Sequence, residues 1–135
     1  MARSIWAVVA GFLFIVVLAG VTTTIAHKVS PAMFAANGAT SNTAMLLMAT
    51  VYVGVFATVG CYLTARLAPQ NPMKHALILG ALGLLFNIAG SVMTWSLYPQ
   101  WYTILNLLLI MPYAWLGGRL RENEVRSMPA KPAMA

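Results

Sequence analysis

Four long apolar segments dominate this chain, and each lacks Asp, Glu, Lys and Arg until its last turn. They cover residues 5–26, 44–67, 75–95 and 101–118. A helix of about 21 residues is about 31 Å long, which matches a hydrocarbon core of about 30 Å. The segments do not alternate polar with apolar residues, which disfavours the strands of a barrel. The sequence therefore predicts an all-α membrane protein with four transmembrane helices in an antiparallel, up-and-down bundle.

Composition agrees with a membrane protein and argues against a nucleic-acid partner. The chain is 61% hydrophobic and 7% charged, whereas soluble domains carry about 25% charged residues. The net charge of +6 comes from bases beside the ends of the apolar segments. A nucleic-acid surface would need bases interleaved with exposed aromatic residues. We therefore expect the lipid bilayer and its anionic headgroups as partners, and no nucleic acid.

The positions of the basic residues predict the orientation. With four helices, one side receives Arg3, Arg66, Lys74, Arg119, Arg121, Arg126 and Lys131, and the other receives Lys28. The positive-inside rule then places both termini in the cytoplasm, with Arg66, Lys74, Arg119 and Arg121 near lipid headgroups. Trp95, Tyr98, Trp101 and Tyr102 surround the charge-free loop 96–100, as expected at the outer interface. We expect a multi-pass protein of the bacterial cytoplasmic membrane.

The chain divides into a transmembrane domain, residues 1–118, and a basic tail rich in Pro and Ala, residues 119–135. The tail cannot build a core, so we expect a frayed helix end followed by disorder. Within the outer loop 27–43, the part at 32–36 is either a short helical turn or plain loop. Pro112 predicts a kink near residues 108–111.

Small residues form stripes at helical spacing in the second and third predicted helices. They lie at 50, 54, 57, 61 and 65, and at 76, 80, 83, 87, 90 and 94. Helices in lipid associate by close backbone approach over such residues. We therefore expect the two stripes to form the central contact, with packing at Gly54, Gly80, Gly83 and Gly90. The alternative is the lining of a substrate path.

Two further motifs favour an internal repeat. The first and third helices contain Ala-x-x-x-Gly, at 7–11 and 76–80, and the second and fourth end on similar residues at 62–67 and 115–120. This pattern indicates either two hairpins in the same orientation, as in parallel repeats, or only a shared interface chemistry.

Four polar residues form a candidate cluster in the outer half of the bundle: Asn87, Asn106, Thr50 and Thr23. A polar group in lipid costs free energy unless it finds a partner. Helical rise puts the two asparagines within about 4.5 Å in depth, so a direct or water-bridged contact is feasible. Either these residues are structural hydrogen-bonding groups or they line a small polar cavity.

The residues offer no catalytic or cofactor site. The acids Glu122 and Glu124 lie in the tail, and no carboxylate lies within the four segments. His27 and His75 fall at opposite membrane surfaces, so they cannot together hold a haem. Cys61 has no second thiol and no adjacent base. We therefore expect no cofactor, no metal and no catalysis.

Three motifs resemble those of a group of uncharacterised small bacterial four-span inner-membrane proteins. They are GCYLTARLAP at 60–69, HALILG at 75–80 after Pro72, and AWLGGRL at 114–120. Members often carry an acid late in the first helix and an arginine early in the second, where this chain has Thr22–Thr24 and Val53. The resemblance implies a membrane location and no known activity.

These observations predict a non-enzymatic accessory or scaffold subunit of a membrane complex or homo-oligomer. One alternative is a small uncoupled channel or transporter with a polar path in the outer half of the bundle. A second is a lipid- or quinone-binding protein that uses Trp95, Trp101 and Tyr113.

Overall fold

The structure, a computed structural model, describes residues 2–129. Over this range the chain forms four long helices, with one short 3-10 turn, η1 (Pro31–Met33), after the first. The helices are α1 (Ala2–Val29), α2 (Thr43–Leu67), α3 (Pro72–Met93) and α4 (Gln100–Ser127). Each is long and apolar enough to cross a membrane, which confirms the predicted all-α bundle of four transmembrane helices.

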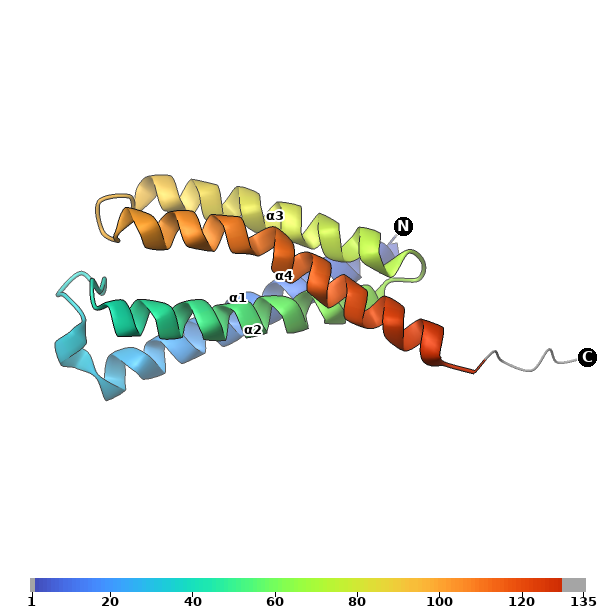
Figure 1. The fold of residues 1–135 in the computed structure, drawn as a ribbon, viewed down its shortest axis with the longest axis horizontal. Coiled ribbons are helices and arrows are strands. Elements are labelled where there is room, and N and C mark those ends of the chain that lie inside the picture. Colours follow the sequence, from blue (N-terminus) through green and yellow to red (C-terminus); the bar gives the residue numbers. More distant parts are fainter. Residues whose placement is uncertain (1, 130–135) are drawn as a thin grey trace, which may run out of the picture.

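Consecutive helices run in opposite directions, so α1 begins and α4 ends at the same end of the bundle (Figure 1). We call this the basic end, because it carries Arg3, Arg66, Lys74 and Arg119. The opposite, aromatic end carries Trp95, Tyr98, Trp101 and Tyr102. The α1–α2 hairpin and the α3–α4 hairpin lie together at the basic end and separate toward the aromatic end (Figure 1).

Short-range signals in the sequence explain where α2 and α3 begin. The side chain of Asn42 caps α2 by accepting a hydrogen bond from the Met45 N–H at 3.2 Å. Pro72 occupies the first turn of α3, where its missing N–H has no helical partner in any case. Asn71 before it adopts a left-handed conformation with φ of 49°, which asparagine tolerates better than most residues. Asn71 and Pro72 together make the turn between α2 and α3 tight.

The core lies toward the basic end and depends on close contact between α1 and α2. Gly11 lies against the carbonyl oxygen of Gly60, which a Cβ on Gly11 would approach to 2.8 Å. In the same region the fully buried Thr64 hydroxyl donates to the Ala7 carbonyl at 3.1 Å. Glycine at these positions brings the helices near enough for that bond, which is how helices associate in lipid.

The α3–α4 hairpin uses the same type of contact. A Cβ on Gly80 would overlap the side chain of Ala114, and one on Gly118 would lie 3.1 Å from the Cβ of Ala76. In both hairpins, therefore, the Ala-x-x-x-Gly motif of the first helix packs on the second helix near its basic end. This correspondence is what two parallel hairpins would show.

Helix α4 also packs closely on α2, which corrects the expectation that the α2 and α3 stripes form the central contact. Gly54 of α2 lies against the Tyr113 ring, and Gly117 of α4 lies against the Thr58 carbonyl oxygen. Cys61 of α2, Ala76 of α3 and Ala114 of α4 belong to one buried cluster. Helix α4 packs more extensively on α2 and on α3 than those two helices pack on each other. Sequence spacing places residues on one face of a helix but does not say which helix that face meets.

The end of α4 differs from the predicted frayed tail, because the helix continues beyond Gly118 to Ser127. Two i,i+3 ion pairs follow this extension, Arg119–Glu122 at 3.6 Å and Arg121–Glu124 at 2.8 Å. Such pairs favour the helical conformation modestly. Lys131 and the rest of the predicted tail, residues 130–135, lie outside the described part. Pro112 lies inside α4, which changes direction near its middle (Figure 1).

Candidate functional site

A pocket of about 510 Å³ lies between the two hairpins. All four helices line it, as does the loop between α3 and α4. The exposed lining residues are Val16 on α1 and Phe86, Asn87 and Gly90 on α3. Those on α2 and α4, such as Cys61 and Thr103, are buried or half-buried. The mouth of the pocket therefore lies between α1 and α3, and α2 and α4 form its floor.

The two helices on either side of the mouth meet at the apolar part of the pocket. The rings of Phe12 on α1 and Phe86 on α3 lie 5.3 Å apart between centroids. Deeper in the pocket, Cys61 and Leu79 belong to the buried core. The pocket is therefore closed toward the basic end by packed side chains.

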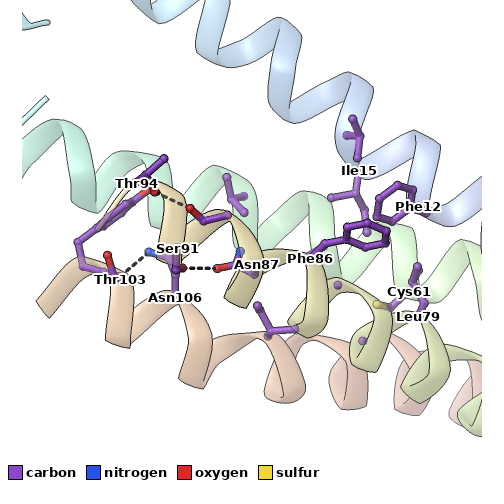
Figure 2. A pocket seen from close by; sticks show the side chains of 18 of the residues that line it. Phe12, Ile15, Cys61, Leu79, Phe86, Asn87, Ser91, Thr94, Thr103 and Asn106 are labelled. Atoms are coloured by element: carbon purple, nitrogen blue, oxygen red, sulfur yellow. Dashed lines mark hydrogen bonds between the residues drawn. The ribbon is translucent and has the colours of Figure 1, made fainter. Parts of the chain in front are cut away.

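Polar and apolar side chains occupy different ends of the pocket (Figure 2). Figure 2 shows Asn87, Ser91, Thr94, Thr103 and Asn106 grouped together, away from the group formed by Phe12, Ile15, Cys61, Leu79 and Phe86. Tyr98 and Tyr102 also line it. Because the polar residues follow Phe86 along α3 and precede Ile110 along α4, the polar part lies toward the aromatic end of the bundle.

The polar group retains hydrogen-bonding capacity for a ligand. The Asn106 amide donates to the Tyr102 carbonyl at 2.8 Å, and the Asn87 carbonyl oxygen accepts from the Ser91 hydroxyl at 3.4 Å. An asparagine side chain offers two N–H donors and two acceptor lone pairs. Each of these two bonds uses one of the four positions of its amide. Both amides offer donors and acceptors to a molecule in the pocket.

The four residues of the predicted polar cluster do not form one site. Asn87 and Asn106 line the same pocket, but each makes its hydrogen bond within its own helix. Thr50 is buried in α2 and donates to the Leu46 carbonyl at 3.0 Å. Thr23 shares a hydrogen bond of 3.0 Å with the Tyr52 hydroxyl.

Thr23 lines a separate, smaller pocket of about 140 Å³ beneath the loop between α1 and α2. His27 also lines that pocket and stacks on Phe34, with ring centroids 3.8 Å apart. The two pockets share Val53, Tyr98 and Tyr102, so they are neighbours at the aromatic end. Of these two neighbours, the larger one has a mouth between helices and a lining that is polar at one end and apolar at the other.

The four glycines expected to pack helices fall into two pairs. Gly54 and Gly80 make the close contacts described above. Gly83 and Gly90 have open space within 4 Å of the place where a Cβ would lie, and both line the larger pocket. The α3 stripe therefore packs on α4 in its first half and lines the pocket in its second. Packing residues and pocket-lining residues follow the same helical spacing, so the sequence could not distinguish helix packing from the lining of a path.

Thr94 lies in the α3 stripe, for which the lining of a path was the alternative interpretation, but Ser91 and Thr103 were not predicted as pocket residues. A usable signal was present, because Ser91 is four residues after Asn87 and Thr103 three before Asn106, so each pair shares a helix face. The aromatic residues named for lipid or quinone binding lie elsewhere. Tyr113 packs on Gly54, and neither Trp95 nor Trp101 is among the pocket residues.

The four basic residues expected at lipid headgroups fall into two pairs with different surroundings. Arg119 and Arg121 pair with the acids of the α4 extension, and the Arg119 guanidinium lies 5.9 Å from the centre of the Trp115 ring. Arg66 and Lys74 are exposed at the same end.

Acid is expected to weaken the contact that joins α2 to the α4 extension. Tyr62 donates to the Glu124 carboxylate at 2.6 Å, and this bond, followed by that from Arg121, lowers the pKa of Glu124 below its ordinary value of 4.5. A lowered pKa stabilises the fold at pH values above 4.5, and the contribution is lost as the pH falls through the lowered value. Tyr62→Phe should therefore lower the Tm at neutral pH, and by progressively less as the pH falls below 4.5. Thermal unfolding of both proteins over a series of pH values from 7 downward checks this, and a difference that stays constant throughout would contradict it.

Comparisons with protein-family models, curated proteins and solved structures find no match to this chain.

Proposed function

We propose that this protein is a non-enzymatic integral membrane protein that binds an amphiphilic molecule in the pocket between its two hairpins. The observation that supports this is the divided lining of the pocket, with hydroxyl and amide groups at one end and aromatic and aliphatic groups at the other. Its volume of about 510 Å³ lies within the range of about 300–1,000 Å³ typical of small-molecule sites.

The position of the pocket in a membrane supports the same proposal. The mouth lies between two helices that can each span the bilayer, so it faces lipid rather than water. With the basic end in the cytoplasm, as the charge distribution predicts, the polar part of the pocket lies in the outer half of the bilayer. An amphiphile entering from that leaflet would bring its chain to Phe12 and its head to Asn106.

Mass spectrometry under native conditions tests the proposal. The protein is purified in a mild detergent, which is removed in the gas phase. The mass of the protein is recorded before and after organic extraction of its bound molecules. We expect one bound amphiphile for each chain, released by extraction and identifiable in the extract. A chain that carries no extractable mass, and that takes up none from added cell lipids, would contradict the proposal.

A second candidate, the accessory or self-associating subunit, is favoured by outward-facing small residues. Gly20 on α1 is exposed and has open space where a Cβ would lie, so the backbone there is accessible to another helix. Sizing in mild detergent, combined with identification of co-purifying proteins, tests this candidate. A stable monomer without a protein partner would exclude it and leave amphiphile binding unaffected.

A channel receives less support from the geometry. The apolar part of the pocket ends at the buried residues Cys61 and Leu79. At about the same depth as these residues, α4 packs closely on both neighbours, with Gly117 against Thr58 of α2 and Ala114 against Gly80 of α3. A polar path continuous across the bilayer would have to pass this packed region.

A further inference from the structure

We infer that the amphiphile has an uncharged head with hydroxyl or carbonyl groups, as in a monoacylglycerol. This inference rests on the proposed amphiphile site and adds the chemical class of its ligand. It depends on three features of the larger pocket: the charge of its lining, the distance of the basic residues, and the hydrogen-bonding groups at its polar end.

The lining of the pocket carries no formal charge. All of its residues belong to the described part of the chain, and none is Asp, Glu, Lys, Arg or His. The bases Arg3, Arg66, Lys74 and Arg119 lie at the basic end, whereas the polar part of the pocket lies toward the aromatic end. Lys28, the base nearest the aromatic end along the chain, is exposed and lines neither the larger pocket nor its smaller neighbour.

A phosphate or carboxylate head would therefore enter without a counter-charge. An ion removed from water needs an opposite charge or a full set of hydrogen bonds, and otherwise it binds poorly or becomes protonated. The polar end of this pocket offers neutral amides and hydroxyls only. Such groups both donate and accept, so they match a head that also does both. A glycerol or hydroxyl head meets this condition, and a phosphomonoester does not.

Ligands with one chain and different heads test the inference. The delipidated full-length protein is titrated at pH 8 with 1-oleoylglycerol, oleate, 1-oleoyl lysophosphatidate and 1-octadecene, and native mass spectrometry gives each apparent Kd. The Gly83→Leu variant, with a side chain in the open space of the pocket, identifies binding at this site. We expect 1-oleoylglycerol to bind at least tenfold more tightly than the other three.

Variants of the polar end supply a second measurement. Asn87→Leu, at an exposed position, should weaken 1-oleoylglycerol binding about tenfold and leave 1-octadecene binding unchanged. Lysophosphatidate or oleate binding as tightly as 1-oleoylglycerol would overturn the inference of an uncharged head while leaving the amphiphile site. Equal binding of 1-octadecene would show that the polar end recognises no head, and would also overturn it. If none of the four binds in a Gly83-dependent way, the amphiphile site itself fails.

Discussion

Replacing Gly117 with alanine is expected to destabilise the bundle by about 3 kcal/mol, the upper part of the range for overpacking a close contact. A Cβ at this position would lie 2.6 Å from the Thr58 carbonyl oxygen, 2.7 Å from the Cys61 Cβ and 2.8 Å from the Tyr62 backbone nitrogen. Two of these atoms belong to the α2 backbone, which cannot rotate away as a side chain can. The new methyl group must therefore push α4 from α2.

The measurement is reversible unfolding in mixed detergent micelles, followed by far-UV circular dichroism. Gly20→Ala is the matched control, because the same change occurs within α1 where no atom lies within 4 Å of the new Cβ. That variant should be as stable as the parent or more stable by up to about 1 kcal/mol, because alanine favours the helix over glycine. Equal stability of the two variants would mean that α2 and α4 are not in contact at Gly117.

Replacing Gly83 with leucine is expected to abolish amphiphile binding while leaving the stability of the bundle unchanged. No atom lies within 4 Å of a Cβ at Gly83, and the residue is half-buried in the lining of the pocket. A leucine side chain there occupies space that the ligand would need, without displacing a neighbouring helix. We expect the apparent Kd to rise at least 100-fold.

Gly20→Leu is the control for this change, because Gly20 has the same open surroundings and does not line the pocket. Binding is measured by native mass spectrometry, and stability by the unfolding experiment described above. The Gly20 variant should bind as the parent does. If both variants bind equally well, the ligand lies outside the pocket between the hairpins.

The fold was largely predictable because membrane helices follow from the length of apolar segments. Without charged interruptions, the segment that became α3 had to remain helical to satisfy its backbone in lipid. Pro72 marked where α3 begins. The extension of α4 was not predictable, because Tyr62 and Glu124 are far apart in sequence and meet only after α2 and α4 have packed.

The pocket was predictable only in part, because depth follows from sequence but the rotation of a helix about its axis does not. Helical rise predicted similar depths for Asn87 and Asn106, and both residues line the pocket. Thr50, which was predicted to belong with them, is instead buried in α2 and donates a hydrogen bond within its own helix. The outcome for each residue was decided by the close contacts of α4 with α2 and α3, which fix how each helix is turned.

Photo-crosslinking in liposomes tests whether an amphiphile binds between the two hairpins with its head at the polar end of the pocket. The probe is a monoacylglycerol that carries a diazirine either near its head or near the end of its chain, and the crosslinked peptides are identified by mass spectrometry. We expect the head probe to label α3 and α4 around Asn87 and Asn106, and the chain probe to label residues 12–16 and 79–86. Labelling by both probes spread evenly over outward-facing residues such as Val9, Val51 and Leu108 would contradict it.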